Sequence, residues 1–286
     1  MMKLSTALLF LFMIVPSLLM GQQDQQQWNA RCTIPSDKAC IDWDKGVAYA
    51  VGYGAPPKDA GARSNPMARR AAKIDAARNV LELIKGVNLD SNTNMENAAL
   101  SNDQVSVNMS GVLHSLREVG EAKYYSDRTI MVRVAVSLRE VMPTEVIYQD
   151  SSATPRQVDA PSAISGGSTL SPQTAYTGLI IDARGTGVLP AMSPKVFDPE
   201  GKEVYGSAYV SREWAISQGI VGYLKDVNTA QGNDRVKGNP AVVKAVEARG
   251  AKKADLVLNK GDADTLRSIA QSQTFLREGR VIIILD

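Results

Sequence analysis

The side chains most able to do chemistry are those of His114, Cys32, Cys40, Asp182 and Arg184. Their spacing argues against an enzyme. His114 is the only histidine in the chain, and it stands in the apolar, strand-like segment SGVLHSLREVG. No G-x-S-x-G segment supplies an elbow for a nucleophilic serine. Gly185-Thr186-Gly187 lacks the third glycine and the Lys-Ser/Thr pair of a phosphate-binding loop, so it indicates a turn at a strand end. We expect His114 to be a core or sheet-surface residue and predict no catalytic residue and no cofactor.

The two cysteines, Cys32 and Cys40, enclose a short loop with Pro35, Ser36 and Asp37 to turn the chain. A metal site would need further ligands, and the single histidine does not provide them. In an oxidising compartment, a pair at this spacing favours a disulfide over a metal or redox site. Closing so small a loop adds only about 2.5 kcal/mol, which makes the bridge a local staple.

Asp182 and Arg184 flank the end of the apolar segment GLIIDAR, just before a glycine turn. Charges at the exit of a buried strand either form an ion pair that fixes the loop or offer a polar contact to a partner or ligand. The sequence leaves both readings open. Asp262 and Asp264 are interpreted as helix-capping and dipole partners.

Composition places the chain among soluble globular proteins. Of its 286 residues, 44% are hydrophobic and 22% are charged, and 32 basic residues stand against 30 acidic ones. The net charge of +2 and the lack of a dense Lys/Arg run exclude a nucleic-acid footprint. We therefore expect no nucleic acid partner.

Residues 1–21 have the pattern of a secretory signal peptide. Lys3 supplies the positive charge, residues 8–20 form a short apolar run, and Gly21 precedes a glutamine-rich stretch. No cysteine follows this run to carry a lipid anchor, and no other segment is apolar enough to span a bilayer. The sequence predicts a periplasmic or secreted protein that reaches the outer membrane only through protein contacts.

After an N-terminal segment at 22–41, which holds the predicted disulfide loop, a first domain is expected at 42–148. It consists of a strand at 45–54, an alanine-rich helix ending at Gly86 and a long antiparallel hairpin. One strand of the hairpin carries Val105, Val107 and Met109, and the other is the alternating run at 129–138. Asp75, Arg78, Glu82 and Lys85 are expected to form an ion-paired, solvent-facing stripe on the helix.

Residues 149–174 are rich in Ser, Pro, Ala and Gly and have the composition of a linker. The second domain, at 175–286, is expected to be a mixed sheet with two helices, at about 212–226 and 262–271. A strand is favoured at 241–248, and the continuous apolar run RVIIILD predicts a central strand covered on both faces. The fold class is therefore α+β, in two small domains.

The segments AVGYG (50–54), ARRAAKIDAARNVLELIKGV (68–87) and TIMVRVAVSL (129–138) resemble the LPP-twenty lipoprotein family. They are also similar to the N-terminal domain of flagellar assembly protein T. The resemblance covers about 45–140. It implies an envelope protein, linked in several members to the outer membrane, flagellar basal-body disks or rings, and motility.

From these observations we expect a non-enzymatic exported envelope protein with a structural or assembly role, associated with the flagellar basal body or the outer membrane. Envelope or flagellar proteins, or a second copy of the chain, would be its partners, and exposed sheet edges would be its contact surfaces. The alternative is a periplasmic module that binds a small ligand or glycan near Asp182 and Arg184.

Overall fold

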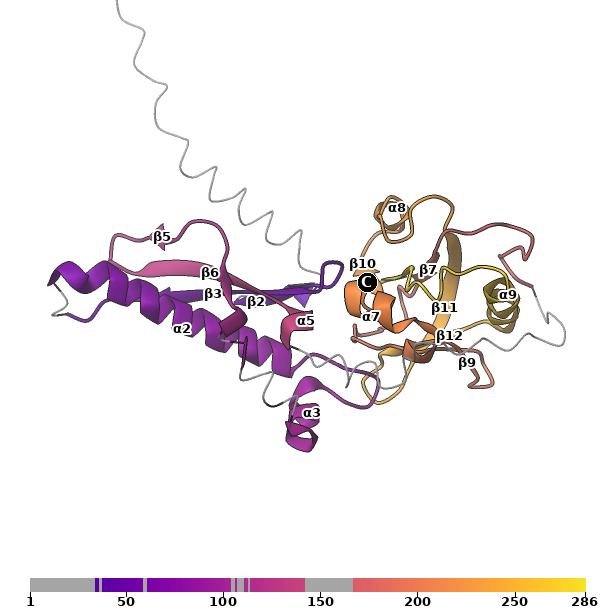
Figure 1. Cartoon of the computed structure of the whole chain (residues 1–286), viewed down its shortest axis with the longest axis horizontal. Coiled ribbons are helices and arrows are strands. Elements are labelled where there is room, and N and C mark those ends of the chain that lie inside the picture. The colour runs from indigo at the N-terminus through magenta and orange to yellow at the C-terminus, as the bar shows by residue number, and fades with distance from the viewer. Residues whose placement is uncertain are drawn as a thin grey trace, which may run out of the picture.

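The computed structural model describes residues 34–35, 38–58, 61–103, 106, 111–112, 114–141 and 167–286. The predicted signal peptide, Cys32 and most of the predicted linker lie outside these residues. Two bodies lie end to end, one built around the long helix α2 and one around a larger sheet (Figure 1). Both helices and sheets are present, which confirms the α+β class.

The first domain is an antiparallel sheet with one long helix on it. The strand order is β1-β2-β3-β6-β4, and β5 also pairs with β6. The strands are β1 (Ile34–Pro35), β2 (Ala39–Asp42), β3 (Val47–Gly54), β4 (Arg117–Glu118), β5 (Lys123–Tyr124) and β6 (Ile130–Ser137). The helices are η1 (Gly61–Arg63), α2 (Ser64–Lys85), α3 (Met95–Ser101) and α5 (Leu138–Val141). β2 belongs to this sheet, so the sheet reaches back before residue 42.

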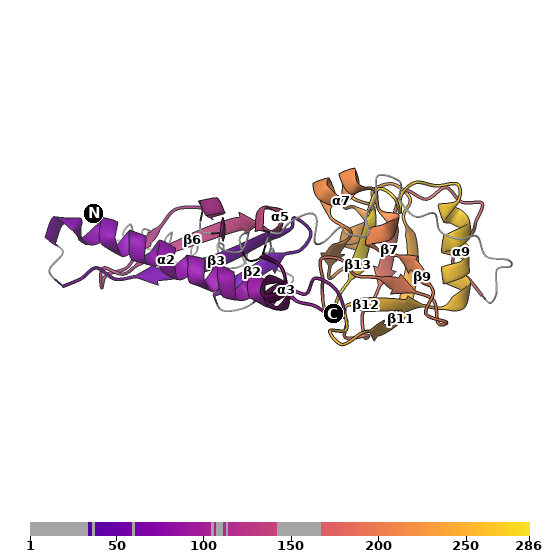
Figure 2. The same ribbon diagram turned by 60° about the horizontal axis from the view of Figure 1, so that its bottom comes forward.

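Helix α2 packs on the sheet (Figure 2). The packing is so close that main-chain atoms of the helix lie directly against strand β3. Its contact face carries Ala68, Ala72, Ala76, Val80 and Ile84, all fully buried. Opposite them, a Cβ added at Gly52 would stand 2.2 Å from the Ala72 carbonyl oxygen, and one at Gly54 would stand 2.2 Å from that of Ala68. Only glycine leaves room for so close an approach. The AVGYG segment and the alanine-rich helix therefore pack directly against each other.

Two predictions for this domain were wrong in detail. Arg78, Glu82 and Lys85 face solvent, but no ion pair joins them among the described residues, and the half-buried Asp75 accepts a hydrogen bond from the Tyr53 amide at 2.9 Å. Ser106 and His114 are helical where a strand was expected, because local polar residues interrupt the alternation there. His114 is exposed and helical, so it lies neither in the core nor on a sheet. Val105, Val107 and Met109 lie outside the described residues.

The second domain is a mixed sheet in the order β10-β13-β7-β11-β12-β8-β9. Its strands are β7 (Leu179–Asp182), β8 (Val196–Phe197), β9 (Glu203–Tyr205), β10 (Gly222–Leu224), β11 (Ala241–Arg249), β12 (Asp255–Leu258) and β13 (Val281–Ile284). Its helices are η2 (Ser207–Tyr209), α7 (Arg212–Gln218), α8 (Val227–Gln231) and α9 (Lys260–Ala270). β10, β13, β7 and the first half of β11 run parallel, and the remaining pairs are antiparallel except β12 with β8.

The mixed sheet and the central position of β13 are confirmed, since every residue of β13 is buried and strands flank it on both sides. The strand at β11 is also confirmed. The helix expected at 212–226 is shorter, because Gly219 ends it with a φ of 79° and residues 222–224 form strand β10 instead. The short helix α8, which was not predicted, adds a third α-helix to this domain.

Candidate functional site

Asp182 and Arg184 lie together at the end of β7, as the sequence suggested. The Arg184 guanidinium donates from Nε to Asp182 Oδ1 at 2.8 Å and from Nη2 to Oδ2 at 2.7 Å. The Arg184 amide donates to Oδ1 as well, at 3.2 Å. These hydrogen bonds lower the pKa of Asp182 and raise that of Arg184. Each charge is thus neutralised by the other.

The neighbouring strand ends add further groups to this edge of the sheet. Asp286, which follows β13, accepts a hydrogen bond from the Gly185 amide at 2.8 Å, and its main-chain oxygen accepts one from Lys225 Nζ at 2.7 Å. Asp226 caps α8 by accepting from the Thr229 amide at 2.7 Å. The carboxyl ends of three parallel strands meet here, which is where open α/β sheets often bind ligands. In this protein, however, the polar groups are committed to one another and to the backbone.

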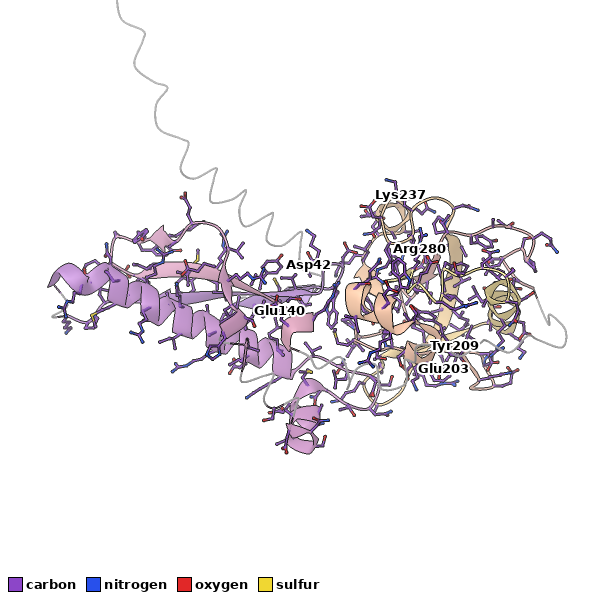
Figure 3. The ribbon with its side chains drawn as sticks, in the orientation of Figure 1. Asp42, Glu140, Glu203, Tyr209, Lys237 and Arg280 are labelled. Carbon is purple, nitrogen blue, oxygen red and sulfur yellow. The ribbon has the colours of Figure 1, made fainter. Side chains whose placement is uncertain are left out.

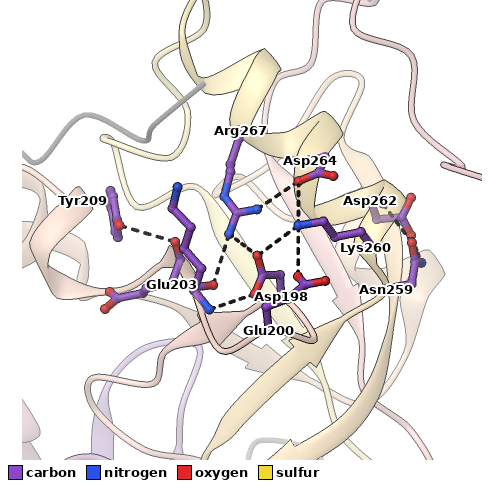
Figure 4. A network of polar contacts seen from close by, with 10 residues as sticks. Asp198, Glu200, Glu203, Tyr209, Asn259, Lys260, Asp262, Asp264 and Arg267 are labelled. Atoms are coloured by element: carbon purple, nitrogen blue, oxygen red, sulfur yellow. Dashed lines mark hydrogen bonds and ion pairs between the residues drawn. The ribbon is translucent and has the colours of Figure 1, made fainter. Parts of the chain in front are cut away.

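A second polar cluster is buried inside the domain (Figure 4). The Arg267 side chain, 2% exposed, donates to Asp198 Oδ2 at 2.7 Å and to Asp264 Oδ1 at 3.0 Å. Lys260 lies 3.6 Å from Asp198 Oδ2 and 2.9 Å from Glu200 Oε2. Burial favours the neutral acid at Asp198, but the hydrogen bonds from Arg267 and the Lys202 amide outweigh it and lower the pKa of Asp198.

This cluster corrects the interpretation of Asp262 and Asp264. The cap of α9 is Asn259, which accepts a hydrogen bond from the Asp262 amide at 2.8 Å. The Asp262 carboxylate reaches back to the segment before β7 and accepts from the Thr169 amide at 2.9 Å. Asp264 is the buried ion partner of Arg267. The partner of Asp262 is 93 positions away, which no local pattern reveals, whereas Asp264 pairs with an arginine three positions along the same helix.

The two domains are joined by a third set of contacts, made largely by main-chain atoms of the segment that follows α2. The Asn88 and Leu89 carbonyls accept hydrogen bonds from the Met192 and Ser193 amides, at 3.0 and 2.7 Å. The Ser91 carbonyl accepts another from the Lys252 amide at 2.9 Å. Residues 88–91 of the first domain are therefore hydrogen-bonded to two separate loops of the second.

Ser91 is the centre of this contact and is 2% exposed. Its hydroxyl donates to the Arg249 carbonyl at 3.0 Å and accepts from the Asp255 amide at 2.9 Å. Gly250 has a φ of 89°, and a Cβ there would stand 2.3 Å from the Ser91 Cβ. Residue 250 must be glycine for both reasons. Burial raises the pKa of the adjoining Asp255 carboxyl, against hydrogen bonds that act to lower it.

Aromatic and polar side chains extend the contact on its other side. The Trp43 ring meets the buried Tyr223 ring edge-on, with centroids 5.5 Å apart, and the Tyr223 hydroxyl donates to the Ala191 carbonyl at 2.9 Å. Asn233 donates to Asp44 at 3.1 Å, and Arg139 donates to the Ser217 carbonyl. Asp42, at the end of the first domain nearest the second, marks this region in Figure 3. We call the contacts of residues 43–44, 88–91 and 139 with the second domain the interdomain joint.

The remaining sequence predictions concern metals, membranes and the disulfide. Among the described residues, no group of His, Cys, Asp and Glu could hold a metal ion. No helix within the described ranges is long and apolar enough to cross a bilayer. Cys40 is buried on β2 and is disulfide-bonded. Its predicted partner, Cys32, lies outside the described residues, so that pairing stays a prediction.

Comparison with known proteins finds a similarity for the second domain only. A family model described as the second domain of Treponema pallidum Tp0624 matches residues 178–286, from the first residue before β7 to the last residue of the chain. No curated protein matches the chain. The resemblance of the first domain to the LPP-twenty family stays a prediction.

Sequence reasoning located Asp182 and Arg184 but missed the joint and the Arg267 cluster. The signal that could have indicated the joint is the polar run NLDSNTN at 88–94, directly after a helix and between apolar segments. Such a run looks like an ordinary turn unless its long-range partners are known. For Arg267, the arginine spaced three residues after Asp264 was the only local cue.

Proposed function

We propose that the protein is a non-enzymatic structural or assembly factor of the bacterial cell envelope, exported to the periplasm and held at the outer membrane or flagellar basal body by protein contacts. The observation that supports this proposal most is the interdomain joint. Domains linked in one chain are expected to move relative to each other unless the contact between them is extensive. Here main-chain hydrogen bonds and the Trp43–Tyr223 ring contact oppose such motion.

A fixed joint suits a protein that holds partners at a set distance. An enzyme or binding protein that closes over a ligand between its domains needs a hinge instead. In this chain, Asn88, Leu89 and Ser91 of the first domain are all hydrogen-bonded to the second domain, which opposes such a closing motion. The geometry therefore favours a scaffold over a closing clamp.

The surface that we propose for partner contact lies at the far end of the first domain. Tyr53, Tyr124 and Tyr125 are exposed to 51%, 60% and 46%, and the Tyr53 and Tyr125 rings are 6.5 Å apart. Tyr53 alternates with Gly52 and Gly54, which face α2, so its ring lies on the opposite face of the sheet. Tyrosine is enriched at protein interfaces because it offers apolar area and a hydroxyl together. We call Tyr53 and Tyr125 the tyrosine patch; Tyr124 pairs with Ile130, as Gly54 does, and so lies on the α2 side of the sheet.

The sheet edges are less suitable as contact surfaces than the sequence suggested. The edge strands β9 and β10 have three residues each, and β4 and β5 have two each. Short edge strands offer few unpaired main-chain groups. The alternative of a ligand or glycan site at Asp182 and Arg184 is also disfavoured, because a ligand would first have to displace a bidentate ion pair.

The proposal is tested by crosslinking the tagged full chain in its native envelope and identifying what copurifies. Basal-body or outer-membrane proteins should be recovered with the wild type and lost with Tyr53→Ser/Tyr125→Ser. The matched control, Leu100→Ser/Val246→Ser, removes two other exposed apolar side chains and should leave recovery unchanged. A strictly monomeric wild type that is absent from envelope fractions would contradict the proposal.

A further inference from the structure

The outward face of α2 has an unusual composition. Because Ala68, Ala72, Ala76, Val80 and Ile84 bury one row of the helix at spacings of four, the opposite row is turned to solvent. That row contains Arg70, Ile74 and Arg78, also four residues apart. Arg63 and Met67 flank it at one end, and Lys85 does so at the other. Ile74 and Met67 are 50% and 45% exposed, so apolar side chains alternate with cations along the helix.

Two further cations of α2 are neutralised within the domain, whereas three others of α2 and Arg63 at the end of η1 are not. Arg69 and Lys73 both pair with Glu118 on β4. By contrast, Arg63, Arg70, Arg78 and Lys85 have no hydrogen-bond or ion-pair partner for their side chains among the described residues. Glu82 is the one acidic residue on the same exposed face of α2. The chain as a whole carries only +2, so this concentration of positive charge is local.

A cationic face without internal partners attracts an anionic occupant. A second copy of the same face would bring like charges together, which is repulsive. Helix α2 has 22 residues, which at 1.5 Å per residue gives a straight line of about 33 Å. A continuous flat anionic surface can neutralise cations along this whole length and also take up the apolar side chains between them. An anionic bilayer offers both, since its headgroups are negative and its acyl boundary lies directly beneath them.

We propose that the outward face of α2, formed by Arg63, Met67, Arg70, Ile74, Arg78 and Lys85, docks the protein on the surface of an anionic phospholipid bilayer. The helix lies in the plane of the interface, with its cations at the headgroups and Ile74 and Met67 directed toward the acyl boundary. The tyrosine patch, on the other face of the sheet, stays available to a protein partner. The inference rests on the proposed envelope location, but its test needs no protein partner.

The test measures partition of the mature protein onto vesicles. Exported protein is used, so that the apolar residues 1–21, predicted to be removed, do not contribute. Phosphatidylglycerol vesicles should bind the protein, phosphatidylcholine vesicles should not, and raising the salt concentration should weaken binding. Arg70→Gln/Arg78→Gln/Lys85→Gln should reduce the partition constant about a hundredfold, since each basic residue near an anionic surface contributes about fivefold. Glu82→Lys should raise it several-fold.

The matched control is Lys244→Gln/Lys253→Gln/Arg277→Gln, which removes three exposed cations of the second domain and should leave binding unchanged. Ile74→Asp tests the apolar contribution and should weaken binding at constant ionic strength. Equal binding to both lipids, equal loss in both triple variants, or binding to soluble polyglutamate but not to vesicles would each overturn the inference. Vesicle binding that persists when copurification fails would refute the proposed assembly role and leave this inference standing.

Discussion

The two domains are stabilised by different means. In the first, α2 and β3 approach so closely that main-chain atoms meet across Gly52 and Gly54, and the buried helix row is mostly alanine. In the second, longer side chains fill the space between helices and sheet, and the buried Arg267 cluster lies among them. The contact between α2 and β3 requires that residues 52 and 54 have no side chain, whereas the Arg267 cluster requires that each charged side chain has its partner. Different substitutions should therefore destabilise the two domains.

The largest effect is expected from Gly52→Ala. The new Cβ would stand 2.2 Å from main-chain atoms of Ala72 and Ala76, so the helix must move away from the sheet. Overpacking of a core usually costs about 1–3 kcal/mol. A clash with main-chain atoms of α2, which cannot rotate away as a side chain can, should exceed that range. Hydrogen exchange of the β3 and β6 amides measures the loss. Gly86→Ala, at an ordinary helical φ of −75° with 3.5 Å to its nearest neighbour, is the control and should be neutral or slightly stabilising.

Arg267→Met should have the next largest effect and should act on the second domain. It leaves the buried Asp198 and Asp264 with only the more distant Lys260 as a cation, at 3.6 and 3.5 Å, and breaking a buried pair costs about 3–5 kcal/mol. Urea denaturation, with hydrogen exchange of β8 and α9, measures the change. Replacing Asp198 and Asp264 by Asn in the same chain should recover much of the loss, because the uncompensated charges are then gone. Arg249→Met, which removes a more exposed ion pair, should change the free energy of unfolding by less than about 1 kcal/mol.

A substitution in the interdomain joint should affect the docking of the two domains and not the folding of either one. Ser91→Ala removes a buried hydroxyl and leaves the Arg249 carbonyl and the Asp255 amide without this partner. Unsatisfied buried groups cost about 1–3 kcal/mol, and the loss should appear as looser docking while each domain stays folded. Faster exchange of the Lys252 and Asp255 amides with unchanged exchange in β3 and β6 is the expected result. Equal acceleration in both domains would show that the joint is part of a single folding unit.

How far the sequence predicted these features depends on how local each one is. The alanine row and the AVGYG segment are local, and they predicted a helix lying close to a strand. The apolar run at β13 likewise predicted a covered central strand. Arg267, Ser91 and Asp262 acquire their roles from partners far along the chain, and single-sequence patterns do not reach that distance. The truncated helix at Gly219 was missed because its apolar spacing continues into β10, where the same side chains are buried by a strand.

Acid should change the contributions of Asp42 in the first domain and Asp198 in the second in opposite directions. Burial raises the pKa of Asp42 above its ordinary 3.8, despite the hydrogen bond from the Lys45 amide. The folded first domain therefore binds this proton more readily, and the contribution of Asp42 to stability decreases as pH rises from 3.8 through the raised pKa. The pKa of Asp198 is lowered below 3.8, so its contribution is present above that pH and is lost as pH falls through the lowered value.

A pH titration of unfolding, read separately in each domain, checks these signs between about pH 3 and 6, where carboxyl groups titrate. Asp42→Asn should flatten the dependence in the first domain and increase its stability at neutral pH by about 1 kcal/mol or less, since one pKa unit corresponds to about 1.4 kcal/mol. The second domain should keep its own dependence in this variant. An unchanged pH dependence of the first domain in Asp42→Asn would contradict the assignment.

The smallest effect is expected from Asp182→Asn, at the one position where the sequence predicted a functional contact. The pair with Arg184 is geometrically ideal but lies at the surface, where ion pairs contribute about 0–1 kcal/mol. Asparagine can still accept the hydrogen bond from the Arg184 amide, so the turn should survive. Thermal unfolding of the second domain measures the change, with Asp234→Asn, from another exposed pair, as the control. A loss of thermal stability well above that of the control would mean that the pair holds the ends of β7 and β13 together through Gly185 and Asp286. The role of this edge would then be to stabilise the sheet.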